Sequence, residues 1–410
     1  MEKKNVLDIL EERGYIDQVT HRDELKELLG SEPVTFYIGF DATADSLTLG
    51  HFLTVMAMMH MQKAGHRPIA LLGGGTTMIG DPSGRNDMRK VMTKEFIEHN
   101  AKCFKNQLSN FLDFGEGKAR FVNNADWLLN LNYLDFMRTV GTHFTVNKML
   151  SYDSYKNRLE DGLTFFEFGY MPLQSYDFLH LYREYDCRLQ LGGSDQWSNM
   201  IGGFELVRKV EQAKVYAMTF SLLTTADGIK MGKTAKGAIW LDEKKTPPYE
   251  MYQYLRNVDD RDVIKFMKLL TFVPMEEIRE YEKLEGSSIN KAKERLAYEV
   301  VKTVHGEDEA NKAQEAAKAL FTTGADSDNI PTTEFDKEEF KEGKNLIELM
   351  KELSLIKSNS EGRRLIEQNG ISIDGEKVND VNAVITEDNF KDDKILIKKG
   401  KKVYHQVKFK

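Results

Sequence analysis

The strongest constraint on the fold is a strand–helix–strand pattern near the N-terminus. Residues 33–40 (PVTFYIGF) have the composition of a strand, and residues 68–75 (PIALLGGG) form a second apolar run that ends in glycines. Between them, residues 49–64 carry apolar side chains at helical spacing. Two strands joined through a helix over about 40 residues predict a βαβ unit within a parallel sheet.

A third strand extends this prediction. Residues 187–191 (CRLQL) are followed by Gly192 and Gly193. Open parallel sheets bind ligands at the carboxyl ends of their strands. The glycine-ending strands therefore indicate one shared pocket in an α/β fold with a Rossmann-like parallel sheet.

Composition excludes several classes of protein. The chain has 410 residues, 41% hydrophobic and 30% charged, which is typical of about two to four soluble domains. No apolar run approaches the roughly 20 residues that span a membrane, and the charged N-terminus does not resemble a signal peptide. The two cysteines, Cys103 and Cys187, are not in a CxxC pair. We therefore expect a cytoplasmic protein with no membrane partner, disulfide framework or zinc site.

Changes in composition divide the chain. We expect a first α/β domain over residues 1–245 and a helical domain over 246–321, which opens with prolines in TPPYEMYQYL. Residues 322–345 are polar and acidic, which predicts a linker. Residues 346–410 would form a small α+β domain. The net charge is −8, but the last 20 residues hold eight lysines against two aspartates. Those lysines indicate either a phosphate-facing patch or a solvated strand edge.

The first βα turn is a candidate phosphate site. The strand at 33–40 brings Tyr37, Gly39 and Asp41 to the carboxyl edge of the sheet, and the next helix begins at Gly50-His51. Glycine allows a ligand close to the backbone, and a helix N-terminus favours anions. Taken alone, the same residues also fit a turn followed by a half-buried histidine.

A second candidate lies at residues 228–234 (GIKMGKT). Lys230, Lys233 and Thr234 could form a cationic clamp. The stretch is not a Walker P-loop, because Asp227 occupies the position of its first glycine. Taken alone, it also fits an exposed lysine turn.

Together, the Gly-His turn and the lysine loop resemble those of class I aminoacyl-tRNA synthetases. Five further stretches resemble tyrosyl-tRNA synthetases: YIGFDATADSL, GDPSG (80–84), FEFGYMPLQSYDF (166–178), LQLGGSDQW (189–197) and GAIWLD (237–242). The similarity runs in order from about residue 5 to the C-terminus. The pattern of the related tryptophanyl enzymes is not seen at 166–178. Two positions depart from the family: Thr48 replaces the first histidine of His-x-Gly-His, and Arg85 stands where lysine is common. Both retain a hydrogen-bond donor.

The stretch at 166–178 predicts a helix with a polar face. Tyr170, Gln174 and Asp177 share one side of a helix, which must begin near Tyr170 because Pro172 is tolerated only in the first turn. Buried polar groups need partners, which a bound amino acid could supply. The alternative is a solvent-facing stripe.

The resemblance implies a role for each matching residue. At tyrosine it implies Tyr37 and Asp177 near the phenol, Asp81, Tyr170 and Gln174 near the ammonium group, and Gln190 and Gln196 near the carboxylate. At ATP it implies Gly39, Asp41, Thr43, Gly50, His51 and Thr54 along the nucleotide, Gly192 and Asp195 at the ribose, and Thr48, Arg85, Arg89, Lys230, Lys233 and Thr234 at the phosphates. Mg²⁺ would accompany ATP without a dedicated protein metal site.

The final domain has its own motif. Ser358 and Glu361 predict a capping box that opens a helix, and residues 371–378 (ISIDGEKV) predict a strand–turn–strand. This resembles the small RNA-binding module of a ribosomal small-subunit protein, which also ends bacterial tyrosyl-tRNA synthetases. The implied tRNA contacts are Arg363, Arg364, Lys398, Lys399, Lys401 and Lys402.

The resemblance implies a homodimer that contacts through residues around 130–160, activates L-tyrosine with ATP and charges tRNA(Tyr). The alternative is a non-catalytic RNA-binding protein on a synthetase scaffold. Such a protein should have a broken ATP site, whereas Gly50, His51, Asp195, Lys230 and Lys233 are all present.

Overall fold

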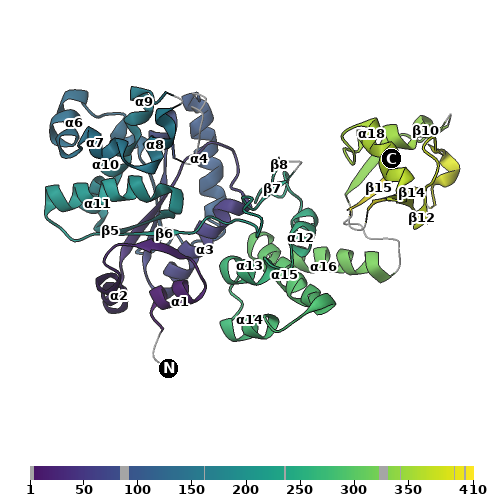
Figure 1. The fold of residues 1–410 in the computed structure, drawn as a ribbon, viewed down its shortest axis with the longest axis horizontal. Coiled ribbons are helices and arrows are strands. Elements are labelled where there is room, and N and C mark those ends of the chain that lie inside the picture. Colours follow the sequence, from purple (N-terminus) through teal and green to yellow (C-terminus); the bar gives the residue numbers. More distant parts are fainter. Residues whose placement is uncertain are drawn as a thin grey trace. The chain divides into compact units, whose positions relative to one another are not determined.

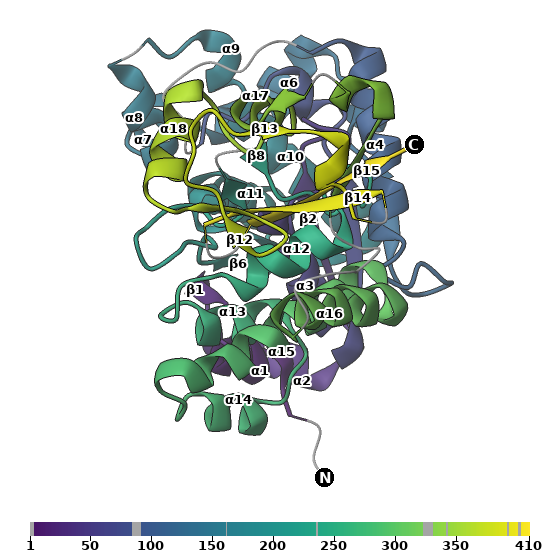
Figure 2. The same cartoon turned by 90° about the vertical axis from the view of Figure 1, so that its right-hand side faces the viewer.

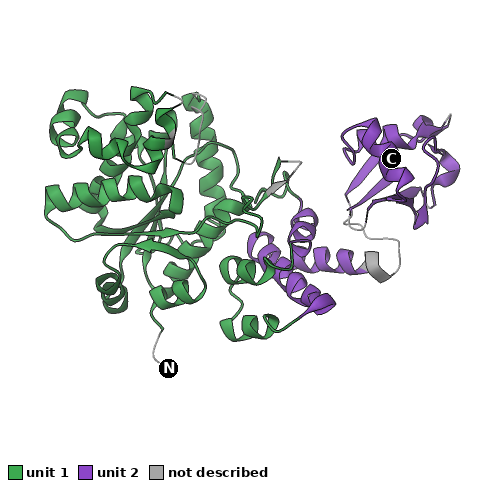
Figure 3. Cartoon of the chain, in the orientation of Figure 1, with its two compact units in different colours: residues 1–246, 259–284 green, residues 247–258, 285–410 purple. Residues whose placement is uncertain are grey.

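The computed structural model describes residues 4–83, 92–160, 162–234, 237–322, 331–341, 343–391, 393–400 and 403–410; side chains at 157, 233, 234 and 319–322 are not described. The chain forms two compact units (Figure 3). Unit 1 comprises residues 1–246 and 259–284, and unit 2 comprises residues 247–258 and 285–410.

Residues 259–284 belong to unit 1, whereas the sequence predicted that they lie in the helical domain. Within unit 1, helix α13 (Val263–Leu270) packs on α3 (Leu49–Ala64). The buried Arg13 guanidinium donates to the carbonyls of Lys268, Thr271 and Val273 at the end of α13. These long-range bonds hold the segment to unit 1, and no local sequence pattern indicated them.

A six-stranded sheet organises unit 1, in the order β1-β6-β5-β2-β3-β4. Its strands are β1 (Ile16–Val19), β2 (Thr35–Phe40), β3 (Arg67–Leu72), β4 (Arg120–Asn123), β5 (Cys187–Gly193) and β6 (Tyr216–Phe220). Neighbouring strands from β6 to β4 pair in parallel, and only β1 is antiparallel among these pairs. The predicted α/β fold with a parallel sheet is confirmed.

The strand order places a ligand crevice beside β2. The chain leaves β2 through α3 to β3 on one side, whereas β5 pairs with the other side of β2. Tyr37 on β2 is level with Ile69 on β3 and Gln190 on β5. Such a reversal of strand order is where open α/β sheets bind ligands, beyond the carboxyl ends of their strands.

Helices cover both faces of this sheet. In Figure 1, α10 (Tyr170–Tyr185) and α11 (Trp197–Glu211) lie on one side of β5 and β6, with α1 (Val6–Glu12) and α2 (Arg22–Ser31) on the other. The remaining helices of unit 1 are α4 (Lys94–Leu108), α5 (Ala125–Leu128), α6 (Tyr133–Thr139), α7 (Val146–Leu150), α8 (Asp153–Leu159), α9 (Phe165–Phe168) and α14 (Met275–Tyr281). Helix α3 matches the range predicted from its apolar spacing, and α10 begins at Tyr170 as Pro172 requires.

Unit 2 begins with three helices that pack on one another: α12 (Pro248–Arg256), α15 (Asn290–His305) and α16 (Glu307–Thr322). Pro248 lies in the first turn of α12, where its missing N–H leaves no helical bond unmade. Of the helices within the described ranges, none has the length and apolar character needed to cross a membrane.

The C-terminal part of unit 2 has a five-stranded sheet in the order β12-β11-β14-β15-β9. The strands are β9 (Thr332–Phe335), β11 (Ile371–Ile373), β12 (Glu376–Lys377), β14 (Lys394–Lys399) and β15 (Val403–Phe409), and Figure 2 shows β14 and β15 side by side. Strands β10 (Lys344–Asn345) and β13 (Val384–Ile385) pair separately. The predicted hairpin is confirmed: Asp374 and Gly375 both have positive φ, as a tight two-residue turn requires.

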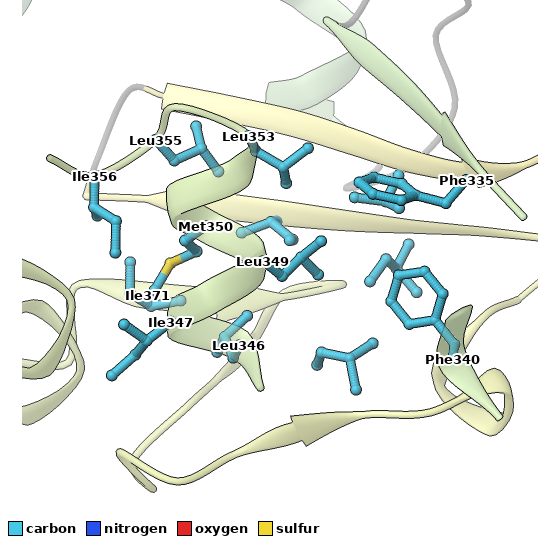
Figure 4. Close-up of a cluster of buried hydrophobic side chains, with 14 of the residues drawn as sticks. Phe335, Phe340, Leu346, Ile347, Leu349, Met350, Leu353, Leu355, Ile356 and Ile371 are labelled. Carbon is cyan, nitrogen blue, oxygen red and sulfur yellow. The ribbon is translucent and has the colours of Figure 1, made fainter. Parts of the chain in front are cut away.

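Helices α17 (Leu346–Glu352) and α18 (Asn359–Glu367) complete this part, whose own apolar core is shown in Figure 4. The prediction of a linker over residues 322–345 is wrong from Thr332 onward, where the chain already belongs to the C-terminal domain. Strand β9 pairs in parallel with β15, and Phe335 and Phe340 are buried in the core. Two aromatic side chains in an otherwise polar stretch are enough to fix it to the domain.

Candidate active site

A cavity of about 440 Å³ lies at the carboxyl ends of β2 and β5. It brings together most of the predicted residues from both sides of the sheet. Those lining it are Tyr37, Gly39, Asp41, Thr43, Thr48, Gly50, His51, Thr54, Asp81, Tyr170, Gln174, Asp177, Gln190, Gly192, Asp195, Gln196 and Lys230. Arg85 and Arg89 lie outside the described residues, and Lys233 and Thr234 are described only as the backbone of strand β7.

Asp177 is a carboxyl group enclosed within this site. It projects from α10 with 1% of its surface exposed. One oxygen accepts a bond of 2.9 Å from Asn124 Nδ2, and the other accepts one of 2.8 Å from Trp127 Nε1. Burial raises the pKa of Asp177 to about 7, although both bonds favour the ionised form. The two donors therefore orient an acceptor that is close to its protonation midpoint at neutral pH.

Three buried polar atoms of residues lining the cavity lack partners. Tyr37 Oη, Gln174 Oε1 and Gln190 Oε1 make no hydrogen bond to any residue that the structure describes. Leaving a buried polar atom unpaired costs about 1–3 kcal/mol. These atoms, on β2, α10 and β5, are therefore suited to a polar ligand that completes their bonds.

Two of the other carboxylates in the lining accept hydrogen bonds from neighbouring side chains. Asp41 accepts bonds from Thr76 Oγ1 at 3.1 Å and Tyr170 Oη at 3.3 Å. Asp81 accepts from Gln196 Nε2 at 2.6 Å and Asn199 Nδ2 at 3.3 Å. Their negative charge favours a cationic ligand group, such as an ammonium.

Thr48 and His51 contact each other at the start of α3. The Thr48 N–H donates to His51 Nδ1 at 3.1 Å, and the Thr48 hydroxyl lies 3.0 Å from the same nitrogen. Burial lowers the pKa of His51 to about 4, so the imidazole is neutral at pH 7. Because Nδ1 accepts the backbone proton, the imidazole proton lies on Nε2. Thr48 thus sets the tautomer that makes His51 Nε2 a donor.

The resemblance implies that the Thr48 hydroxyl donates to an ATP phosphate. Because a neutral hydrogen bond contributes about 0.5–1.5 kcal/mol, Thr48→Ala should slow the implied ATP-dependent activation step roughly 2- to 15-fold. The backbone bond to Nδ1 survives in this variant, so the tautomer is retained. Single-turnover rates should show this loss, whereas Thr48→Ser should remain within about twofold of the parent because it keeps the hydroxyl. Equal rates for Thr48→Ala and the parent would contradict a role for the hydroxyl.

The lysine loop is held against the same helix. The N–H of Leu49 donates to Ile239 O, and the N–H of Ile239 donates to Gly232 O. Gly232 has a φ of +81°, and a Cβ there would lie 3.3 Å from the Cβ of Leu49. Glycine therefore lets the loop turn close to α3, which brings Lys230 into the cavity lining.

In the C-terminal domain, the predicted RNA contacts differ in their surroundings. Arg363 and Arg364 are exposed on α18, and Lys398 Nζ lies 5.0 Å from the ring centre of Tyr404. Lys399 instead donates to Glu361 Oε1 at 2.7 Å and to Leu355 O at 2.6 Å. Lys401 and Lys402 lie outside the described residues.

The predicted capping box is formed only in part. Ser358 Oγ accepts the Glu361 N–H at 3.2 Å, as predicted. The Glu361 carboxylate accepts from the Lys357 N–H and pairs with Lys399 instead of returning to Ser358. The nearby lysine thus redirects this carboxylate.

Sequence reasoning missed four residues that support the site: Thr76, Asn124, Trp127 and Asn199. Each donates a hydrogen bond to the carboxylate of Asp41, Asp81 or Asp177. A signal existed for Asn124, because the run RFVNN places polar residues directly after a strand. Within the described ranges, no group of three or more His, Cys, Asp or Glu side chains could hold a metal ion.

Comparisons with known proteins agree with this architecture. The family model described as "tRNA synthetases class I (W and Y)" matches residues 30–322, and this is the class that the sheet and its cavity define. A model described as "Tyrosine--tRNA ligase SYY-like C-terminal domain" matches residues 322–407. The tyrosine–tRNA ligase of Acetivibrio thermocellus is 61% identical, covering 98% of this chain and 99% of that protein. The chain therefore belongs to the tyrosine–tRNA ligase family of class I synthetases.

Other relatives agree. The tyrosine–tRNA ligase of Clostridium beijerinckii is 58% identical, covering 99% of this chain and 100% of that protein. A C-terminally truncated mitochondrial tyrosyl-tRNA synthetase from Aspergillus nidulans superposes with a TM-score of 0.70 at 31% identity, covering 78% of this chain and 95% of that chain. A tryptophanyl-tRNA synthetase from Encephalitozoon cuniculi, at 13% identity and a TM-score of 0.56, covers 75% of this chain and 87% of that chain, and shares the fold.

Proposed function

We propose that this enzyme activates L-tyrosine with ATP, giving tyrosyl-adenylate and pyrophosphate, and then transfers the tyrosyl group to the 3′ end of tRNA(Tyr). The observation that carries the proposal is the presence of Tyr37 and Asp177 in the lining of the same cavity. An unpartnered buried hydroxyl and a buried carboxyl lie on neighbouring elements of one site. A phenol hydroxyl can accept from the first and donate to the second.

The other ligand groups follow from the charges around the cavity. The tyrosine ammonium would lie near Asp81, Tyr170 and Gln174, which provide one carboxylate and two neutral acceptors. Its carboxylate would lie toward the Nε2 groups of Gln190 and Gln196, which are the donor ends of these amides; Gln196 Nε2 also donates to Asp81 at 2.6 Å. This orientation directs the tyrosine carboxylate toward the nucleotide.

ATP would occupy the part of the site beside α3. Asp41, Thr43 and Thr54 would line the nucleotide, while open space over Gly39 admits a ligand against the backbone. Gly192 and Asp195 would bind the ribose. The donors toward the phosphates would be Thr48, Gly50, His51, Lys230, Lys233, Thr234, Arg85 and Arg89. ATP would enter as its Mg²⁺ complex, as a substrate.

The chemistry needs no protein nucleophile. The tyrosine carboxylate attacks the α-phosphate and pyrophosphate leaves; a ribose hydroxyl of the tRNA then attacks the tyrosyl carbonyl and releases AMP. Catalysis rests on holding the reactants in line and on donors aimed at the phosphate oxygens. A neutral His51 suits this role, because its Nε2–H donates without titrating near pH 7.

We also propose that the enzyme is a cytoplasmic homodimer. Support comes from large apolar side chains exposed between residues 129 and 166, a concentration typical of an interaction surface. They are Leu129, Tyr133, Leu134, Met137, Val146, Leu159, Phe165 and Phe166. Sedimentation of the purified protein would test the dimer.

Tyrosine-dependent ATP–pyrophosphate exchange tests the proposed activity. The enzyme should catalyse exchange with tyrosine and much less with phenylalanine, and should charge tRNA(Tyr). A non-catalytic RNA-binding protein would bind RNA without exchange, and that result would overturn the proposal.

The affinity for tyrosine should rise with pH below neutrality. With the Asp177 pKa at about 7, the carboxyl is largely protonated at pH 5.5 and must lose its proton before it accepts the phenol hydroxyl. Affinity should therefore increase by up to about tenfold per pH unit below the pKa and level off above it. Calorimetry from pH 5.5 to 8.5 would measure this slope, which Asp177→Asn should flatten. Affinity that falls with rising pH would instead identify the neutral acid as the binding form.

A further inference from the structure

The loop between β2 and α3 is held by side chains from another helix. Residues 41–47 carry Asp41 and Thr43 and lead directly into Thr48. At the first end of the loop, Asn100 Nδ2 on α4 donates to Ala42 O at 2.9 Å. At the other end, Gln107 on the same helix accepts the Leu47 N–H at 2.8 Å.

Asn100 and Gln107 are seven residues apart, so they share one face of α4, separated by about 10 Å along its axis. The rest of that face is apolar, with Ile97, Ala101, Phe104 and Leu108 buried. Asn100 is fully buried among them. A buried amide on an apolar face is unfavourable unless it is bonded. The bond to Ala42 O compensates the Nδ2 of Asn100, whereas its Oδ1 makes no hydrogen bond to any residue that the structure describes.

Gln107 contacts the two residues before the helix cap. Besides accepting from Leu47, it donates through Nε2 to Ser46 Oγ at 2.9 Å, and Ser46 Oγ donates to Leu47 O at 2.9 Å. One side-chain amide therefore fixes the direction in which the chain enters Thr48. Between Gln107 and Asn100 on α4, the Phe104 ring lies 6.2 Å from the ring of His51.

We propose that Gln107 and Asn100 are positioning residues for ATP. Acting through the backbone of residues 41–47, they hold Asp41 and Thr43 at one end and Thr48 with His51 at the other, in the shape that fits the nucleotide. This inference rests on the proposed function. Neither amide lines the cavity, so both act on ATP through the loop.

Gln107→Met tests the proposal, because methionine has a similar length and makes neither bond. Two neutral hydrogen bonds correspond to a loss of roughly 5- to 150-fold in kcat/KM for ATP. The Kd of tyrosine, measured without ATP, should change less than about twofold. Gln107→Glu should lose less than Gln107→Met, because its carboxylate still accepts the Leu47 N–H. Asn106→Ala on the exposed face of α4 is the matched control and should match the parent in both measurements.

Ser46→Ala provides a second variant, which removes the bond from Gln107 Nε2 and the hydroxyl's own bond to Leu47 O but keeps the Gln107 bond to the Leu47 N–H. It should lower kcat/KM for ATP at least roughly 2- to 15-fold in the parent and by less in Gln107→Met, because the contact between Gln107 and Ser46 is then already absent and only the bond to Leu47 O remains to be lost. Asn100→Leu should reproduce the selective loss toward ATP.

Two results would overturn the inference: an unchanged kcat/KM for ATP in Gln107→Met and Ser46→Ala, or equal losses toward ATP and tyrosine. The second would mean general loosening of unit 1. Absence of tyrosine-dependent exchange in the parent would instead refute the proposed function itself.

Discussion

Replacing Asp177 with alanine should lower kcat/KM for tyrosine in the activation step by roughly 100-fold or more. A hydrogen bond to a charged group contributes about 1.5–3 kcal/mol, and about 1.4 kcal/mol corresponds to tenfold in rate. The variant also leaves the amide of Asn124 and the indole of Trp127 facing a space without an acceptor. These orphaned donors add to the loss of the phenol contact.

Pyrophosphate exchange with tyrosine and with phenylalanine would measure the effect. The preference for tyrosine should fall along with tyrosine activity, because phenylalanine makes no bond to Asp177. Asp126→Ala is the matched control: this carboxylate is exposed on α5, next to Trp127, and its loss should leave both substrates unaffected. Unchanged tyrosine activation in Asp177→Ala would remove Asp177 from the substrate site.

Ending the chain at Thr322 should separate the two halves of the reaction. The cavity is built from residues 37–238, all within unit 1, whereas the C-terminal part has its own buried core. Exchange should therefore stay within about twofold of the full-length level. Charging of tRNA should fall severely, since RNA affinity depends largely on phosphate contacts and the truncation removes the exposed Arg363 and Arg364. Ending the chain farther along, near Lys337, would be a poorer choice. That truncation keeps β9 but removes Phe340 and β15, with which β9 shares its core and its sheet.

Salt dependence gives a milder test on the full chain. Arg363→Gln with Arg364→Gln should weaken tRNA binding and reduce the slope of log affinity against log salt by up to about one unit per lost phosphate contact. Tyrosine exchange should be unaffected. Charging that survives truncation at the full-length rate would refute an RNA-binding role for this domain.

Local interactions account for the parts of the fold that sequence reasoning predicted. The range of α3 follows from its apolar spacing, and the start of α10 follows from Pro172, because both depend on contacts within a few residues. The cavity lining was also largely predictable, since parallel strands bring their carboxyl ends to one edge. Gly192 and Gly193 mark such an end in the sequence.

Contacts between distant segments were not predictable in this way. Arg13 bonds α13 to the N-terminal part across more than 250 residues, and Lys399 pairs with Glu361 across 38. The sequence predicted that Phe335 belongs to a polar linker, whereas the structure places it on β9, which pairs with β15. In each case both partners are present in the sequence, but no local pattern shows that they come together.

The sequence by itself determined the α/β class, the order of elements and the residues at the carboxyl edge of the sheet, because hydrophobic periodicity, proline and glycine act locally. Only the tertiary structure decided how that edge works. It surrounds Asp177 with Asn124 and Trp127, makes His51 neutral, and ties the loop at 41–47 to α4. Burial and hydrogen bonding set these properties, and both depend on which distant segments pack together.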